Sequence, residues 1–354
     1  MRELRLMKGN EAVAEAAIRA GADAYFGYPI TPQSEILEYL AEQNPMETTG
    51  MVVLQAESEV ASINMVYGAA SAGRRVMTSS SGPGISLMTE GISYLAGAEL
   101  PCLIVNISRS GPGLGTIQPS QSDYFQATKG GGHGDYRMLV LAPSSVQEMA
   151  DFVALAFDLA FKYRNPVMML SDGVIGQMME KVELPEFQSR KKDHETWATI
   201  GKTSDRERNI ITSLYLDPSK HEQHNKKLQA KYRRMEEEET RCETTFCEDA
   251  EYLVVAYGAS ARISRKAVAL AKEQGIKVGL FRPITLFPFP VKELKAAAKN
   301  AKEILSVEMN AGQMIEDIRL AVDCRIPVKH FGRFGGVIHA PNEILEAIKC
   351  NIYS

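Results

Sequence analysis

Apolar residues in the first half of the chain alternate between two spacings. Where they recur every three or four residues, they predict helices over 10–20, 33–42, 58–72, 85–96 and 145–162. Short apolar runs between these helices predict strands over 24–27, 50–55, 75–78, 102–107 and 167–170. Strands that alternate with helices in this way are typical of a parallel, doubly wound α/β sheet.

The same alternation returns near residue 250, after a polar region. It predicts strands over 252–256, 276–281, 303–307 and 326–330, and helices over 261–274, 291–299, 312–322 and 341–349. The chain, at 354 residues, is long enough for two hydrophobic cores. We therefore predict a doubly wound domain over 1–185, a connector over 186–249 and a smaller α/β domain over 250–354.

The predicted connector is distinguished by its charge. Lys231 to Arg234 contains three basic residues, and Glu236 to Glu239 is an unbroken acidic run. We interpret this region as a linker with a solvated helical arm, and docking onto a partner chain is the alternative.

The composition is that of an ordinary globular protein, with 45% hydrophobic and 24% charged residues. A net charge of −4 gives no indication of the basic surface that nucleic-acid binding requires. No apolar stretch has the length of a membrane span, and the N-terminal residues contain no signal-peptide core. We therefore expect a cytoplasmic protein that binds neither nucleic acid nor membrane.

The cysteines argue against a metal cluster on this chain. They are Cys102, Cys242, Cys247, Cys324 and Cys350. These five form no C-x-x-C pair, and no four of them have the spacing of a zinc or iron–sulfur site. An odd number without a secretion signal favours free thiols.

A stiff loop, Tyr28-Pro29-Ile30-Thr31-Pro32, follows the first predicted strand. Each proline restricts its own φ and excludes the residue before it from the helical region. We expect Thr31 to cap the next helix, with Pro32 at its first position. The loop is either such a cap alone or a rigid corner that presents a hydroxyl to a ligand at the end of a parallel sheet.

Glu59 is the candidate proton-transfer residue. It opens the predicted helix 58–72, whose following turns are apolar and small, and a carboxyl group in such a setting can exchange protons near neutral pH. The alternative is that Glu59 is an ordinary first-turn acid that favours the helix dipole. Glu57, two positions earlier, is expected to point elsewhere.

Arg109 is the candidate anion-binding residue. It follows the apolar strand 102–107, and a guanidinium at the carboxyl end of a parallel strand can bind a carboxylate in a forked geometry. A surface arginine in a loop is the alternative. His133, within a run of glycines, is a second titratable candidate, although a loop histidine without a catalytic role is the simpler interpretation.

Taken together, these motifs resemble those of one known family. The motifs are Tyr28 to Pro32, Glu57-Ser58-Glu59, Thr78 to Gly84 and Ser108 to Pro112. In this order and spacing they resemble the alpha subunit of the 2-oxoacid:ferredoxin oxidoreductases, over essentially the whole chain. Within that family the chain looks most like the 2-ketoisovalerate (3-methyl-2-oxobutanoate) branch, with the 2-oxoglutarate enzyme as a close neighbour.

The resemblance implies thiamine diphosphate chemistry in a pyrimidine-type domain, followed by a transketolase C-terminal-like domain. Glu59 matches the activating glutamate that hydrogen-bonds the pyrimidine ring of the cofactor. Thr31 and Arg109 match the residues that contact the 2-oxoacid, with Arg109 on its carboxylate. The other residues expected to contact the cofactor are Tyr28, Pro29, Ile30, Gly82 and Gly84. The implied reaction converts a 2-oxoacid and coenzyme A to an acyl-CoA and CO2 and reduces ferredoxin.

Departures from the complete cofactor site imply partner chains. The Mg2+ that holds the diphosphate is bound by a Gly-Asp-Gly motif and an Asn in thiamine enzymes, and Ser171-Asp172-Gly173 is the nearest approach here. The resemblance therefore implies a beta subunit that supplies the diphosphate half and Mg2+. It also implies gamma and ferredoxin-like delta subunits, with the iron–sulfur clusters on partner chains.

Two other classes of function remain as alternatives. A non-catalytic assembly subunit would use the α/β domains as a scaffold, and its connector would matter more than Glu59. A dinucleotide-dependent dehydrogenase is disfavoured because no G-x-G-x-x-G follows the first strand. The preferred 2-oxoacid cannot be read from the sequence, because a few methylene groups change substrate discrimination only about 10–200-fold.

Overall fold

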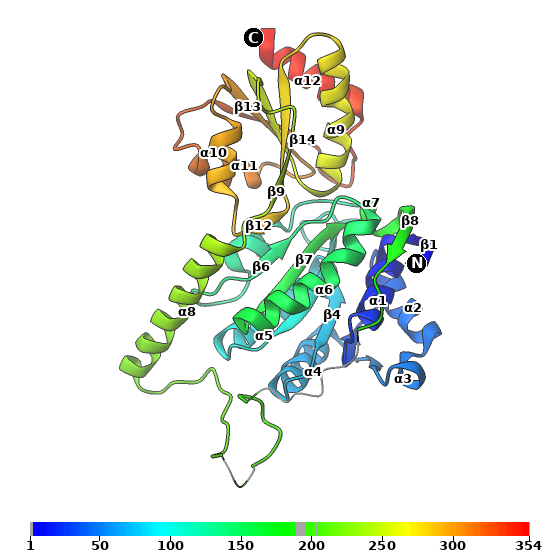
Figure 1. Cartoon of the computed structure of the whole chain (residues 1–354), viewed down its shortest axis with the longest axis vertical. Helices are drawn as coiled ribbons and strands as arrows, with labels where there is room; N and C mark the ends of the chain where they lie inside the picture. Colours follow the sequence, from blue (N-terminus) through cyan, green and yellow to red (C-terminus); the bar gives the residue numbers. More distant parts are fainter. Residues whose placement is uncertain (1–2, 189–195, 203, 205, 354) are drawn as a thin grey trace.

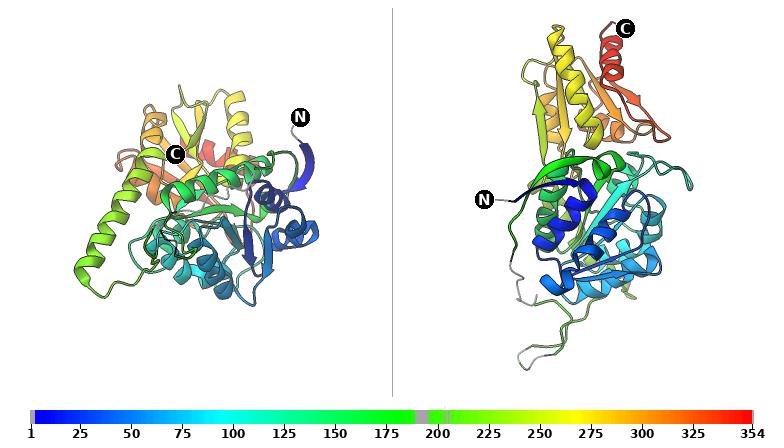
Figure 2. Two further views of the ribbon diagram at one scale, coloured as in Figure 1. Left: turned by 60° about the horizontal axis from the view of Figure 1, so that its bottom comes forward. Right: turned by 90° about the vertical axis from the view of Figure 1, so that its right-hand side faces the viewer.

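The computed structural model describes residues 3–188, 196–202, 204 and 206–353. Two α/β units are stacked along the long axis of the molecule, with the N-terminus on the first unit and the C-terminus on the second (Figure 1). The units remain one above the other when the molecule is turned by 90° (Figure 2).

The first unit is built on a sheet with the strand order β12-β6-β7-β5-β4-β2-β3 within the described residues. Its strands are β2 (Ala24–Gly27), β3 (Val52–Gln55), β4 (Val76–Ser80), β5 (Cys102–Ser108), β6 (Leu139–Leu141), β7 (Pro166–Asp172) and β12 (Thr285–Phe287). Neighbouring strands are parallel, except that β12 is antiparallel to β6. Every residue of β4, β5 and β7 is buried, as expected for parallel strands covered on both faces.

Helices surround this sheet, and a short antiparallel ribbon lies beside it. The helices are α1 (Gly9–Arg19), α2 (Ser34–Gln43), α3 (Pro45–Thr48), α4 (Glu59–Ser71), α5 (Pro83–Gly97), α6 (Val146–Tyr163) and α7 (Gly173–Gln177). The ribbon pairs β1 (Glu3–Lys8) with β8 (Met179–Leu184). In the part of the chain that the structure describes, no helix is both long and apolar enough to cross a membrane.

The second unit is a smaller sheet with the strand order β14-β13-β10-β11-β9 within the described residues. Its strands are β9 (Cys242–Thr245), β10 (Tyr252–Val255), β11 (Val278–Pro283), β13 (Glu303–Glu308) and β14 (Val328–Gly332). The helices are α9 (Gly258–Glu273), α10 (Val291–Ala297), α11 (Met314–Ala321) and α12 (Pro341–Tyr353). β9 is antiparallel to β11, and the other neighbours are parallel.

The helices and strands expected from the sequence are present, with ends that differ by a few residues. Two strands cross the expected division of the chain. β9 lies within 186–249 but forms the edge of the second sheet, and β12 lies within 250–354 but joins the first sheet through the pairing of Thr285 with Leu141. These cross-connections tie the two units together through backbone hydrogen bonds.

The expected helical arm is α8 (Pro218–Glu238), which runs along one side of the first unit (Figure 1). It is docked on its own chain rather than fully solvated. The buried side chains of α8 itself are Leu228, Tyr232 and Met235. Lys227 and Lys231 form ion pairs with Glu99 of the first unit. The polar surface of α8 therefore faces the solvent, while a narrow apolar stripe and two lysines hold the helix in place.

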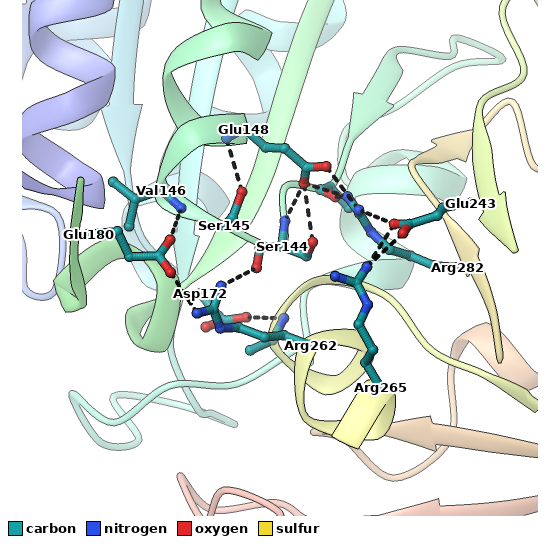
Figure 3. Close-up of polar contacts among 12 residues, drawn as sticks. Ser144, Ser145, Val146, Glu148, Asp172, Glu180, Glu243, Arg262, Arg265 and Arg282 are labelled. Atoms are coloured by element: carbon teal, nitrogen blue, oxygen red, sulfur yellow. Dashed lines mark hydrogen bonds and ion pairs between the residues drawn. The ribbon is translucent and has the colours of Figure 1, made fainter. Parts of the chain in front are cut away.

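A cluster of charged residues around the buried Arg282 joins the two units (Figure 3). Arg282 of β11 is only 2% exposed. Its guanidinium donates to both carboxylate oxygens of Glu148, at 2.9 Å and 2.5 Å, and to Glu243 Oε2 at 3.0 Å. Arg262 extends the cluster by donating to Glu180 at 2.6 Å. The units are thus held by a buried arginine whose partners come from both of them.

Asp172 is a second buried charge at this interface. Its Oδ1 accepts hydrogen bonds from the N–H groups of Val174 at 2.8 Å and Ile175 at 3.2 Å, and its Oδ2 from Ala259 N at 3.4 Å. Burial raises the pKa of Asp172 to about 6, although these hydrogen bonds oppose the shift. Asp172 thus caps α7 and contacts the first turn of α9.

Candidate active site

The Tyr28–Pro32 loop lies at the carboxyl end of β2, but Thr31 does not cap the following helix. α2 begins at Ser34 with Gln33 as its N-cap, so the predictions of Thr31 as cap and Pro32 as first helical residue are wrong. The reason is a turn that ends before the helix, in which Gln33 N donates to Ile30 O at 3.0 Å. Thr31 is exposed, and its hydroxyl is not used in capping.

The Tyr28–Pro32 loop is connected to the strands β2 and β4 by a chain of hydrogen bonds. Gln33 Nε2 donates to Tyr28 O at 3.0 Å, and Ser79 Oγ donates to Gln33 Oε1 at 2.5 Å. The Tyr25 hydroxyl lies 2.7 Å from Ser79 Oγ, and burial raises the pKa of Tyr25 above its usual range. The loop is therefore anchored to the end of β4 as well as to β2.

Glu59 is enclosed where two helices begin. It is the first residue of α4 and only 6% exposed, and its predecessor Ser58 caps the helix by accepting from Ala61 N at 3.2 Å. Across from it, a Cβ atom on Gly84 would lie 2.6 Å from Glu59 Oε1 and 2.1 Å from Ser80 Oγ. The carboxyl group therefore occupies space that exists because residue 84 has no side chain, which an ordinary exposed first-turn acid would not need.

Replacing Gly84 by Ala should disturb this enclosure directly. Because both contacts are closer than any real Cβ allows, Glu59 and Ser80 must move, and overpacking of this kind costs about 1–3 kcal/mol. We expect the Gly84→Ala chain to unfold at a lower urea concentration than wild type, with a loss of about 1–3 kcal/mol in the free energy of unfolding. Gly68→Ala is the matched control, because that exposed position on α4 has open space around it. Equal stability of the two variants would contradict this role of Gly84.

Arg109 lies at the end of β5 and is brought to the same loop. It is 8% exposed, which rules out a surface arginine, and its Nη1 donates to Thr31 O at 3.0 Å. A Cβ on Gly82, whose φ is +44°, would lie 3.4 Å from Arg109 Cγ. Arg109 Nε is buried without a hydrogen-bond partner among the described residues. The guanidinium therefore keeps donor capacity that a bound anion can use.

A residue that the sequence analysis did not single out, Asp123, lies in the same region. Its Oδ2 accepts from Asn106 Nδ2 at 3.0 Å, the Gly82 N–H and the Ser108 hydroxyl also interact with the carboxyl group, and the positive charge of Arg109 is close enough to act on it. Burial raises its pKa, and these neighbours oppose the shift. One sequence signal could have identified it, since Asp123 is the only charged residue between Arg109 and Lys129.

Arg109 and Asp123 line a cleft of about 610 Å³ between the two units. The first unit contributes Gly82 and the loop that begins at Ser110. The lining residues from the second unit are Asn310, Ala311, Gln313, Phe334 and Gly335. The cleft lies at the carboxyl ends of parallel strands, where α/β sheets bind ligands.

Other candidates lie apart from this cluster. The His133 ring contacts Tyr94 edge-on at 5.9 Å, and its carbonyl accepts from Ser93 Oγ, as in an ordinary structural loop. The cysteines are free thiols. Within the described ranges, we find no group of three or more His, Cys, Asp or Glu side chains arranged to hold a metal ion.

Comparison with known proteins agrees with this architecture. Residues 15–244 match the family "Pyruvate flavodoxin/ferredoxin oxidoreductase, thiamine diP-bdg", and residues 250–344 match "Pyruvate:ferredoxin oxidoreductase core domain II". The chain is 53% identical to ketoisovalerate oxidoreductase subunit VorB of Methanothermobacter thermautotrophicus, over 98% of this chain and 97% of the relative. It is 38% identical to 2-oxoglutarate synthase subunit KorA of Archaeoglobus fulgidus, over 98% and 99% of the two chains.

Solved structures show the same fold. A 2-oxoglutarate:ferredoxin oxidoreductase from Magnetococcus marinus, solved with 2-oxoglutarate, coenzyme A and succinyl-CoA bound, superimposes with a TM-score of 0.89 at 29% identity. The alignment covers 99% of this chain, which spans 66% of the length of that solved chain. A split gene transketolase shares the fold alone, with a TM-score of 0.61 at 13% identity.

The two matched domains and the fold define a thiamine diphosphate-binding oxidoreductase subunit. The chain belongs to the 2-oxoacid:ferredoxin oxidoreductase family, and it is similar over nearly its whole length to the ketoisovalerate oxidoreductase subunits called VorB. The predicted fold class and the predicted family are both confirmed.

Proposed function

We propose that this chain is the catalytic alpha-type subunit of an enzyme that oxidatively decarboxylates ketoisovalerate, forming an acyl-CoA and CO2 and reducing ferredoxin. The preference for a branched-chain substrate is supported by 53% identity to a VorB subunit, against 38% to a KorA subunit. A higher kcat/KM for 2-oxoglutarate than for ketoisovalerate in the assembled enzyme would overturn this assignment in favour of the alternative substrate.

The residues around Glu59 fit the pyrimidine end of thiamine diphosphate. The missing side chain at Gly84 makes room for the buried carboxyl group itself, and the hydroxyls of Ser80 and Ser81 are buried without hydrogen-bond partners in the described part of the chain. When bound, the cofactor supplies the electron sink that the loss of CO2 requires. In this proposal Glu59 holds a proton at the ring nitrogen of the pyrimidine, in an enclosed site that excludes water. We propose that the other residues in contact with the cofactor are Tyr28, Pro29, Ile30, Gly82 and Gly84.

Arg109 and Thr31 are proposed to hold the substrate. The contact between Arg109 Nη1 and the Thr31 carbonyl, at 3.0 Å, is the single observation that carries this proposal. Among the described residues that line the cleft, Arg109 is the only lysine or arginine, and it is buried. Through this contact it lies next to the exposed Thr31 of the loop. A buried guanidinium pairs with a carboxylate more strongly than an exposed one, because water screens the pair less.

We infer that the rest of the enzyme is supplied by partner chains. The relatives are named as subunits, and the described part of this chain holds no cluster of metal ligands. A beta subunit would bind the diphosphate with Mg2+, and gamma and ferredoxin-like delta subunits would complete the complex and carry the iron–sulfur clusters. We propose that it works in the cytoplasm.

Replacing Arg109 by Met tests the substrate site. Charge-assisted hydrogen bonds contribute about 1.5–3 kcal/mol, so we expect the KM for the 2-oxoacid to rise about 10–100-fold in the reassembled enzyme. The kcat at saturating substrate should change much less. Arg74→Met, at an exposed position, is the control that should leave both constants unchanged. Unchanged KM and kcat in the Arg109 variant would exclude this carboxylate-binding role.

A further inference from the structure

We propose that the second α/β unit positions Arg109 for the substrate carboxylate, and that it does so through the side chain of Gln121. Gln121 is then a positioning residue of the reaction, not merely a contact between domains. The inference rests on the proposed function, because it takes Arg109 as the residue that binds the 2-oxoacid.

Gln121 belongs to the first unit but is held by the second. It is 2% exposed. Its Nε2 donates to Tyr257 O at 2.9 Å, and its Oε1 accepts from Ser260 Oγ at 2.7 Å and from Met309 N at 3.0 Å. Its backbone carbonyl accepts from the Tyr257 hydroxyl at 3.1 Å and from Asn310 Nδ2 at 2.9 Å. Both polar atoms of the amide are therefore satisfied by residues of the second unit.

The positions of these partners follow from the topology of the second sheet. Tyr257 follows the end of β10 and caps α9, Ser260 lies in the first turn of α9, and Met309 follows the end of β13. β10 and β13 are parallel neighbours, so their carboxyl ends lie side by side at one edge. A single side chain can therefore be held from two adjacent strand ends at once.

Backbone pairing connects Gln121 to Arg109 on one side. Two residues before Gln121, Pro119 forms an isolated antiparallel bridge with Arg109. Next to that bridge, Ser110 N donates to Gln118 O at 3.1 Å. The backbone on which the guanidinium stands is thus paired with the segment that the second unit holds.

Asp123 connects the same segment to the site on the other side. Two residues after Gln121, its carboxyl group accepts from Asn106 Nδ2, and Asp123 lines the cleft together with Arg109 and Gly82. Gln313 of the second unit secures the intervening backbone, donating to Ser122 O at 2.8 Å. Gln121 therefore stands midway between two contacts with the Arg109 site.

One contact between the units lies away from this site. The Arg262–Glu180 pair joins α9 to β8, and neither residue lines the cleft that contains Arg109. Arg262→Gln therefore loosens the interface without touching the segment that carries Gln121. This variant separates local positioning of Arg109 from a general weakening of domain contact.

The test compares Gln121→Ala, Ser260→Ala, Arg262→Gln and Arg109→Met in the reassembled enzyme. We expect Gln121→Ala to raise the KM for the 2-oxoacid about 5–10-fold and Ser260→Ala about 2–3-fold, with kcat changed less than KM. Inhibition by a non-reactive branched-chain carboxylate should weaken by the same factors. Arg262→Gln should leave KM unchanged. Thermal unfolding of each variant verifies that it is folded. If Gln121→Ala does not fold, the KM values of Ser260→Ala and Gln121→Glu are compared with wild type instead.

Two results would overturn the inference. One is a folded Gln121 or Ser260 variant with wild-type KM and wild-type inhibition by the carboxylate. The other is an Arg262→Gln enzyme whose KM rises as much as that of Gln121→Ala, since the effect would then be general. Failure of the proposed function is distinguishable, because it would leave KM unchanged in Arg109→Met itself.

Discussion

The Glu59→Gln enzyme, reassembled with its partner subunits, is expected to reduce ferredoxin about 10²–10⁴-fold more slowly than wild type. This is the usual contribution of a positioned acid–base group. Gln keeps the size and hydrogen-bonding shape of the side chain, so the enclosure against Gly84 should survive while the exchangeable proton is lost. The measurement is the rate of substrate-dependent ferredoxin reduction at saturating 2-oxoacid, coenzyme A and thiamine diphosphate.

Glu57→Gln is the control for this experiment. Glu57 is exposed and lies two residues before Glu59, so its replacement removes the same charge from nearly the same place in the chain. It should leave the rate unchanged. A Glu59→Gln enzyme that retains its activity would instead favour the alternative of a non-catalytic assembly subunit.

Replacing Arg282 by Met is expected to cause the largest loss of stability, about 3 kcal/mol in the free energy of unfolding. Removal of one partner from a buried ion pair leaves the other charge uncompensated and costs about 3–5 kcal/mol. The lower end applies here, because Glu148 and Glu243 remain partly in contact with water. The measurement is urea-induced unfolding of the full chain followed by circular dichroism.

Two further variants test the cause of this loss. Arg265→Met removes a different donor to Glu243, 2.8 Å away, but from an exposed position, and should cost less than about 1 kcal/mol. Adding Glu148→Gln to Arg282→Met should recover part of the loss, because the uncompensated charge is then removed. A double variant less stable than Arg282→Met would show that packing, not charge, controls this interface.

Local sequence patterns identified most of the secondary structure of this chain. The strong alternation of apolar strands and helices, as in β5 and α6, depends on neighbours within a few residues, and it was predicted close to its observed limits. The cap of α2 was predicted wrongly. A turn closed by Gln33 N and Ile30 O ends before the helix, and the Pro32 carbonyl beside it accepts from Asn10 Nδ2 at 2.7 Å and from Gln177 Nε2 at 3.0 Å. Asn10 and Gln177 are distant in the chain, so the motif from Tyr28 to Pro32 does not indicate these contacts.

The sequence also did not predict that β9 and β12 each pair with a strand across the expected domain boundary. β9 and β12 are short, and each joins the sheet on the far side of the expected boundary. Pairing between segments that are distant in the chain is decided by which strand edges the folded units leave available, and no local pattern encodes that.

The sequence by itself determined the fold class, the family and the candidate residues Thr31, Glu59 and Arg109, because these depend on periodicity and on motifs of adjacent residues. Only the tertiary structure showed that Gly84 makes room for the carboxyl group of Glu59 and that Arg109 contacts the Thr31 backbone. It also showed the role of the segment around Gln121, which joins the site to the second unit. These contacts join residues that are far apart in the chain and that come together only when the ends of separate strands meet in the folded protein. A local sequence pattern therefore cannot predict them.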